Sequence, residues 1–120
     1  MPVTGQAPPE LYAVRLERGG PWDWSRGLRE QEGFEEHGRF MDRLVDEGFI
    51  LLGGPLEGDR DTLHVVVASS EPAIRERIAQ DPWARNGMLR VKSIERWTIL
   101  LDGRALASPP QSGGGPGARP

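Results

Sequence analysis

Residues 49–69 read FILLGGPLEGDRDTLHVVVAS, and this stretch decides the fold. Its first part, Phe49 to Pro55, is a continuous apolar run that predicts a strand. Thr62 to Ser69 alternates along a second predicted strand, and the connecting Gly58-Asp59-Arg60-Asp61 is typical of a turn. Two strands joined by so short a polar turn predict a β-hairpin in the middle of the chain.

A predicted helix lies on each side of this hairpin. Phe34 to Glu47 has apolar residues at three- and four-residue spacing, and Gly48 is well placed to end the helix. We expect its apolar face to contain Phe34, His37, Met41, Leu44 and Val45, with Phe40 beside them. The second predicted helix, Glu71 to Gln80, begins after a cap at Ser69 or Ser70 and ends at Asp81-Pro82.

Two further strands complete the pattern. Leu11 to Leu16 predicts the first strand, and about Met88 to Leu101 predicts the last, with a bulge where the alternation slips between Val91 and Ile94. The resulting order is that of the α+β, ferredoxin-like βαββαβ fold, an antiparallel sheet with two helices on one face. The other face of such a sheet is bare and apolar, so we expect a homodimer to cover it.

The chain of 120 residues is long enough for one domain. We expect residues 10–102 to form that domain. Residues 1–9 and the Gly/Pro-rich tail 103–120 are predicted to be disordered, because they contain almost nothing to bury. The loop from Trp22 to Glu32 carries two tryptophans and is expected to fold back over part of the domain.

Composition excludes several classes of function. The chain contains no cysteine, which rules out disulfides, thiolate nucleophiles and Cys-based metal sites. Its formal net charge is −3 with both signs mixed along the chain, so we expect no nucleic-acid partner. There is no signal-peptide pattern and no apolar stretch long enough to span a bilayer, which favours a cytoplasmic protein with no membrane partner.

A histidine and an aspartate are the candidate chemical groups. His37 lies on the first predicted helix, and Asp81 begins the Asp-Pro-Trp motif that follows the second. A histidine oriented by a carboxylate is the smallest unit that transfers protons near neutral pH. Each residue also has a structural interpretation, because His37 could be a hydrogen-bonded core histidine and Asp81 a helix stop that bonds the nearby backbone.

Other residues are candidates for a substrate pocket. Gly53-Gly54-Pro55 could let a ligand approach the backbone closely, or could mark a strand end or bulge. Trp83 and Trp97 could line an aromatic pocket, although core packing also explains either one. His64 has no evident partner and is interpreted as structural. No cluster has metal-ligand spacing, so we expect neither a metal nor another cofactor.

An ordered set of short motifs resembles the YCII-related proteins of the dimeric α/β-barrel group. The resemblance covers about Leu11 to Leu101. Its motifs are His37-Gly-Arg-Phe-Met-Asp-Arg-Leu, Gly48, Gly53-Gly54-Pro55, Asp81-Pro82-Trp83, Gly87 and Glu95-Arg96-Trp97. It implies a ferredoxin-like fold, a homodimer that forms an α/β barrel, and a site where His37 and Asp81 cooperate. The long loop from Pro21 to Glu32 and the two tails depart from short family members.

Three function hypotheses follow. The leading one is a small cofactor-independent enzyme in which His37 is a general acid or base and Asp81 orients it. The resemblance implies lyase- or dehalogenase-like chemistry on a small organic molecule, and isomerisation is an alternative reaction. The second hypothesis is a non-catalytic small-molecule-binding or accessory dimeric module. In the third, His37 is the axial ligand of a haem, because relatives with this architecture bind haem.

Overall fold

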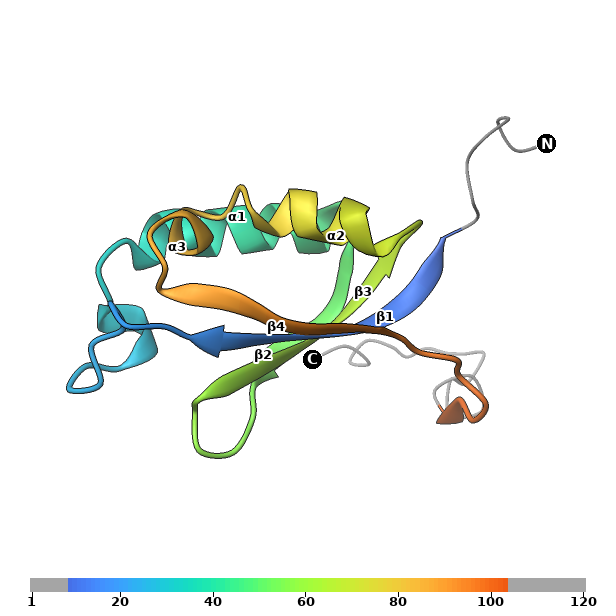
Figure 1. Cartoon of the computed structure of the whole chain (residues 1–120), viewed down its shortest axis with the longest axis horizontal. Coiled ribbons are helices and arrows are strands. Elements are labelled where there is room, and N and C mark those ends of the chain that lie inside the picture. Colours follow the sequence, from blue (N-terminus) through green and yellow to red (C-terminus); the bar gives the residue numbers. More distant parts are fainter. Residues whose placement is uncertain (1–8, 104–120) are drawn as a thin grey trace, which may run out of the picture.

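Four strands form one antiparallel sheet in the computed structural model, which describes residues 9–103 (Figure 1). The strands are β1 (Glu10–Arg18), β2 (Ile50–Pro55), β3 (Asp61–Ala68) and β4 (Leu89–Arg96). Their order across the sheet is β2-β3-β1-β4, and every neighbouring pair is antiparallel. The segments for which we predict disorder, 1–9 and 103–120, lie outside the described residues except for Pro9 and Gly103.

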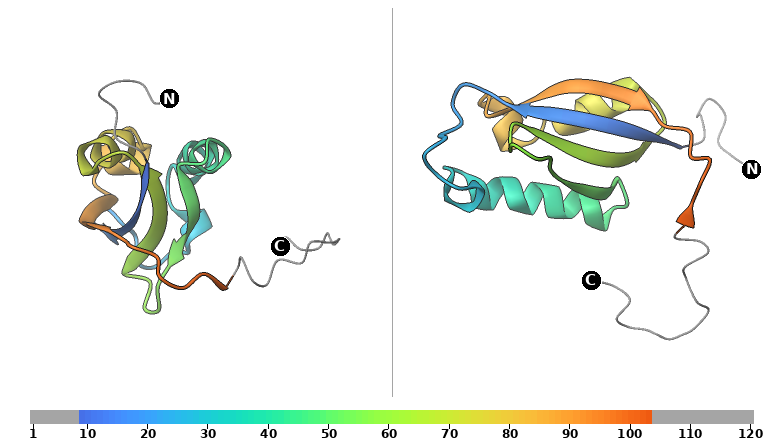
Figure 2. Two further views of the ribbon diagram at one scale, coloured as in Figure 1. Left: turned by 90° about the vertical axis from the view of Figure 1, so that its right-hand side faces the viewer. Right: turned by 90° about the horizontal axis from the view of Figure 1, so that it is seen from below.

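The helices lie together on one face of this sheet. They are α1 (Phe34–Asp46), α2 (Glu71–Ile78) and the short α3 (Pro82–Arg85), and a single 3₁₀ turn, η1 (Leu28–Glu30), precedes α1. Figure 2 shows α1 and α2 side by side above the sheet. The predicted α+β, ferredoxin-like arrangement is therefore confirmed. The short elements α3 and η1 were not predicted, because neither is long enough to show a helical period.

The two main helices begin and end through recognisable caps. Gly48 follows α1 with a φ of +82°, a conformation that glycine adopts without strain, and it ends the helix as predicted. The Ser70 hydroxyl accepts a hydrogen bond from the Ala73 amide at 3.2 Å and so caps α2. The predicted face of α1 is wrong at one position, because Val45 is exposed while Phe40 is buried. One residue beyond the buried Leu44, Val45 is rotated away from the sheet.

Both edge strands of the sheet contain a bulge. In β2, Ile50 pairs with Val66 but Leu52 pairs with Val65, so Leu51 has no partner of its own. The continuous apolar run of β2 is therefore not continuously buried, and Leu51 and Leu52 are exposed. In β4 the register skips Lys92, which confirms the bulge predicted between Val91 and Ile94. Bulges twist sheet edges and interrupt the open ladder that would otherwise pair with other chains.

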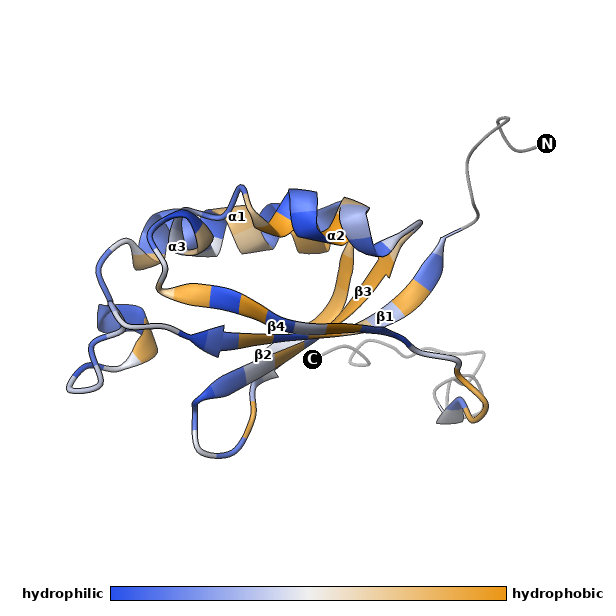
Figure 3. Cartoon of the chain, viewed as in Figure 1, coloured by the Kyte–Doolittle hydropathy of each residue, from blue (hydrophilic) through white to orange (hydrophobic). Residues whose placement is uncertain are grey.

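The hydrophobic core lies between the helices and one face of the sheet, and Figure 3 shows apolar residues along β2 and β3 where they pass beneath α2. Its members include Tyr12, Val14, Leu16, Phe40, Leu44, Val66, Ile74, Ile78 and Trp83. The opposite face of the sheet carries no described helix, yet it also holds apolar side chains. Leu11, Leu52, Val65 and Trp97 line a shallow hollow there. Among residues 9–103, no helix is both long and apolar enough to cross a membrane.

Candidate active site

His37 and Asp81 meet in the interior, 44 residues apart in sequence. His37 Nδ1 lies 2.9 Å from both carboxylate oxygens of Asp81. The histidine is only 8% exposed and the aspartate 1%. Asp81 also caps α3, because its Oδ1 accepts a hydrogen bond from the Trp83 amide at 3.0 Å. Asp81 therefore both caps the start of α3 and contacts the histidine.

The carboxylate determines which nitrogen of His37 carries the proton. An ionised carboxylate only accepts hydrogen bonds, so Nδ1 must donate to Asp81. Nε2 of the neutral ring is then an acceptor. Within the part of the chain that the structure describes, Nε2 has no hydrogen-bond partner, and the ring lines a pocket. This arrangement leaves one nitrogen available to exchange a proton with a bound molecule.

The indole of Trp83 packs against the flat face of the His37 ring. The two rings are stacked, with centroids 4.0 Å apart and planes 10° from parallel. Trp83 is itself restrained, because its Nε1 donates a hydrogen bond to the Glu32 carbonyl at 2.9 Å and the Trp22 ring meets it edge-on at 5.3 Å. A buried and doubly anchored indole leaves the imidazole little freedom to turn.

The pocket beside His37 has a volume of about 120 Å³. Four of the five residues proposed for a substrate pocket line it together with His37, namely Gly53, Gly54, Pro55 and Trp83. The fifth, Trp97, does not. It is 44% exposed and lies at the hollow on the opposite face of the sheet. The remaining lining side chains are Arg18, Trp22, Leu28, Met41, Thr62, His64 and Leu89.

His64 is one of the pocket residues that the sequence analysis did not identify. It lies on β3 directly opposite Gly53 of β2, and it is buried on the helix side of the sheet. Burial, and secondarily the neighbouring His37, lowers the pKa of His64 from 6.5 to about 4, although Asp81 acts in the opposite direction. His64 is therefore a neutral ring at pH 7. The available signal was the hairpin register, which places a glycine across from this histidine.

The Gly53 position has no space for a side chain. A Cβ at Gly53 would lie 2.3 Å from His64 Cδ2, whereas a Cβ at Gly54 would meet nothing within 4 Å. We expect Gly53→Ala to displace the His64 ring and to lower the free energy of unfolding by about 1–3 kcal/mol, as overpacking does. Gly54→Ala is the matched control and should change it by less than about 0.5 kcal/mol. Urea unfolding of both variants measures the difference, and equal effects would contradict this account.

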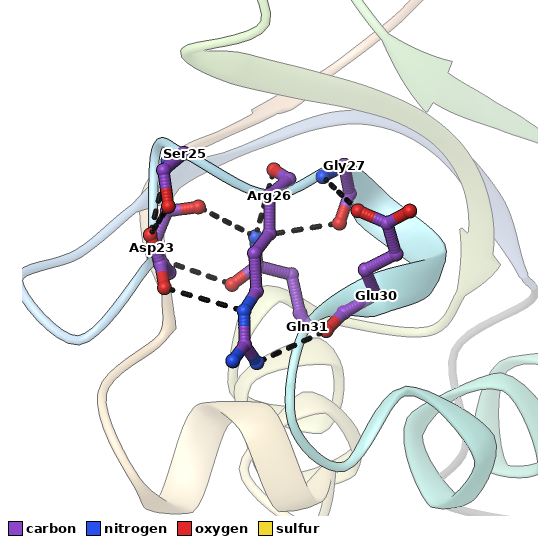
Figure 4. Close-up of polar contacts among 6 residues, drawn as sticks. All are labelled: Asp23, Ser25, Arg26, Gly27, Glu30 and Gln31. Carbon is purple, nitrogen blue, oxygen red and sulfur yellow. Dashed lines mark hydrogen bonds and ion pairs between the residues drawn. The ribbon is translucent and has the colours of Figure 1, made fainter.

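The loop between β1 and α1 forms part of the pocket wall, and Figure 4 shows the polar contacts within this loop. The buried Gln31 amide organises it: Nε2 donates to the carbonyls of Asp23 and Arg26, at 2.8 and 3.1 Å, and Oε1 accepts from the Asp23 amide at 3.0 Å. The loop packs on the domain through the buried Trp22, as expected, while Trp24 remains exposed. Trp22 and Leu28 from this loop face the pocket.

No three His, Cys, Asp or Glu side chains of residues 9–103 lie close enough together to hold a metal ion. His37 and Asp81 form a hydrogen-bonded pair, and the neutral ring of His64 lies beside them. This arrangement suits proton transfer.

The fold has a relative among solved structures. The chain is similar to the 5-chloro-2-hydroxyhydroquinone dehydrochlorinase of Burkholderia phenoliruptrix AC1100, whose structure was solved in complex with 2,5-dihydroxybenzoquinone. The superposition covers 72% of this chain and 93% of the dehydrochlorinase, with a TM-score of 0.56 and 18% sequence identity. At that identity the likeness concerns the fold. Among curated proteins, no relative matches the chain.

A family model describes most of the folded region. The model of the YCII-related domain matches residues 25–98, which include the histidine, the aspartate and the glycine-lined edge of the pocket. The chain therefore belongs to the YCII-related domain family.

Proposed function

We propose that this protein is a small enzyme that uses His37 and Asp81 for acid–base chemistry on a small organic molecule. The reaction we propose is a lyase- or dehalogenase-like elimination, with isomerisation as the alternative outcome. The observation that carries the proposal is the buried contact of 2.9 Å between His37 Nδ1 and Asp81, with the same ring facing a pocket.

In the proposed elimination, the substrate loses a proton and a leaving group from two adjacent carbons. His37 Nε2 removes a proton from a carbon of the bound molecule, and the electron pair of that C–H bond forms a new double bond. The leaving group departs from the adjacent carbon with its bonding electrons. The imidazolium that forms stays paired with Asp81 and later releases its proton. In isomerisation the same proton returns to a different carbon. Both reactions are redox-neutral, so neither needs an electron acceptor, and the proposal includes no cofactor.

The structural neighbour supports this class of reaction. Its name describes a dehydrochlorinase, an enzyme that removes hydrogen chloride from its substrate, and its bound molecule is a single substituted ring. A pocket of about 120 Å³ also suits a molecule of that size, since an engineered cavity of about 150 Å³ binds benzene. It is well below the roughly 300 Å³ at which pockets for drug-sized ligands begin, so the haem hypothesis gains no support.

The test is turnover by a histidine variant. We expect His37→Gln to lower the rate on any substrate found in a screen of small halogenated and hydroxylated rings by about 10²- to 10⁴-fold. Glu35→Gln, an exposed position on the same helix, is the control and should leave the rate unchanged. Undiminished turnover by His37→Gln would contradict the proposal. A ligand that binds the wild type and is recovered unchanged would favour the non-catalytic binding module.

We also infer that two copies associate through the open face of the sheet. The support is the apolar hollow formed by Leu11, Leu52, Val65 and Trp97, which no described helix covers. Association through this face would remove a patch that a monomer rarely leaves in water. Sedimentation equilibrium should then give twice the chain mass of 13.3 kDa. A monomeric mass at micromolar concentration would contradict the inference.

A further inference from the structure

Three buried polar atoms of the described residues have no hydrogen-bond partner, and all three belong to side chains that line the pocket beside His37. They are Arg18 Nε, Thr62 Oγ1 and His64 Nδ1. Folded proteins leave few such atoms unpaired, because each one loses its hydrogen bonds to water on burial. Because all three side chains line one pocket, a molecule bound there is a candidate partner for these atoms.

These side chains form one wall of the pocket because of the sheet register. Thr62 pairs with Leu16 and His64 pairs with Val14, so they follow one another along the buried face of β3. Arg18 lies two residues after Leu16 and therefore shares this face at the end of β1. His37 comes from α1 and faces the pocket from the helix side. A bound molecule would thus have the polar sheet wall on one side and His37 on the other.

Arg18 brings a positive charge that its surroundings only partly balance. The side chain is 5% exposed, and its guanidinium lies 4.1 Å above the ring of Trp22. Its Nη1 bonds the Asp59 backbone carbonyl and lies 3.7 Å from the carboxylate of Asp59, a side chain that is 67% exposed and therefore strongly hydrated. Burial lowers the pKa of Arg18 from its usual value, but a guanidinium remains protonated in proteins. The Arg18 guanidinium can therefore bind a second, anionic partner.

We propose that the pocket recognises a single-ring molecule bearing an anionic oxygen, a carboxylate or a phenolate, with that oxygen bound by Arg18 and Thr62. The ring then lies among the apolar lining residues Trp22, Leu28 and Met41, and its far edge reaches His37. The neutral His64 contributes a hydrogen bond without adding charge. This proposal rests on the function proposed above only because both use the same pocket. Binding of the anion does not require turnover.

Binding of two isosteric probes tests the role of charge. Benzoate and benzamide have the same shape but differ in charge, and 4-nitrophenolate separates the phenolate case from the carboxylate case. Calorimetry should show that one of the two anions binds about 10- to 100-fold more tightly than benzamide, as expected for a charge-assisted hydrogen bond. Arg18→Gln should abolish that preference, and Arg75→Gln, an exposed arginine on α2, should retain it. Equal binding of anion and amide, or no binding of either anion at millimolar concentration, would overturn the proposal.

A second variant distinguishes ligand binding from a structural role and does not depend on the stability of Arg18→Gln. Thr62→Val keeps the shape of the side chain and removes only the unpaired hydroxyl. We expect it to raise the thermal unfolding midpoint while weakening binding of the preferred anion by about tenfold. A lowered midpoint with unchanged binding would show that the hydroxyl serves the fold and would refute its part in recognition.

The two proposals can fail separately. Arg18-dependent binding of an anion together with turnover that does not depend on His37 would leave this inference standing and remove the acid–base function. His37-dependent turnover of a neutral substrate, with no preference for the anionic probes, would do the reverse.

Discussion

Asp81→Asn should switch the proton of His37 from Nδ1 to Nε2. Asp81 Oδ1 accepts a hydrogen bond from the Trp83 amide, and this contact forces the oxygen of an asparagine amide into the same place. The amide NH₂ then occupies the position of Oδ2, 2.9 Å from His37 Nδ1. The amide oxygen at the Oδ1 position also lies 2.9 Å from Nδ1, but a neutral amide oxygen is a weaker acceptor than a carboxylate. Because the NH₂ group only donates and opposes a hydrogen on Nδ1, we expect Nδ1 to become the acceptor and the ring proton to move to Nε2. The nitrogen that faces the pocket can no longer remove a proton.

The tautomer of His37 and the rate of turnover are two independent measurements of this proton switch. Nitrogen-15 NMR of the imidazole should show an Nδ1–H ring in the wild type and an Nε2–H ring in Asp81→Asn, whether or not a substrate is known. Turnover of any substrate identified should fall by about 10²- to 10⁴-fold. Asp42→Asn, an exposed carboxylate on α1, is the matched control for loss of one negative charge. An unchanged Nδ1–H ring in Asp81→Asn would contradict the predicted switch of the proton.

The second large effect is acid destabilisation through His64. Its pKa is about 4 in the folded protein and 6.5 in the reference state, so the unfolded chain binds the proton more readily. The stabilisation that depends on the neutral ring is complete above about pH 6.5 and is lost as the pH falls toward 4. Between pH 7 and pH 5 the free energy of unfolding should fall by about 2 kcal/mol from this group alone. The charged and titratable groups around it are His37, Asp81 and Arg18.

Substitution of His64 isolates this contribution. In His64→Gln the change in unfolding free energy between pH 7 and pH 5 should be about 2 kcal/mol smaller than in the wild type. Comparing the two pH values within each protein cancels any change in basal stability that the substitution causes. Urea unfolding at both pH values provides the measurement. Identical pH dependence in the two proteins would mean that the imidazole of His64 is not held neutral by its burial.

Several elements could be predicted from local sequence because their signals are local. The period of Phe34 to Glu47 and the glycine after it determine α1, and the short turn between two apolar strands determines the hairpin. Burial of Val45, Leu51 and Leu52 could not be predicted this way. Their exposure depends on helix rotation and on the bulge in β2, which only the packed sheet settles.

The pocket residues, too, could be predicted only in part. The pairing of His37 with Asp81 was expected from the resemblance to the YCII-related proteins, and the structure brings the two side chains into contact. Trp83 and Trp97 looked equivalent in sequence, but one stacks on His37 and the other lies on the opposite face of the sheet. A tryptophan at a helix start and one after a strand carry no local signal of which cavity they will meet.

The sequence alone determined the order of the main elements, because that order follows from spacing along the chain. The resemblance to the YCII-related proteins supplied His37 and Asp81 as the acid–base candidates. Only the tertiary structure decided that Arg18, Thr62 and His64 join them in one pocket. Three residues from two strands become neighbours through strand pairing, and the chemistry of each depends on how much water the folded chain leaves around it. Arg18 lies on β1, far in sequence from Thr62 and His64 on β3, so only the pairing of these two strands brings this wall of the site together.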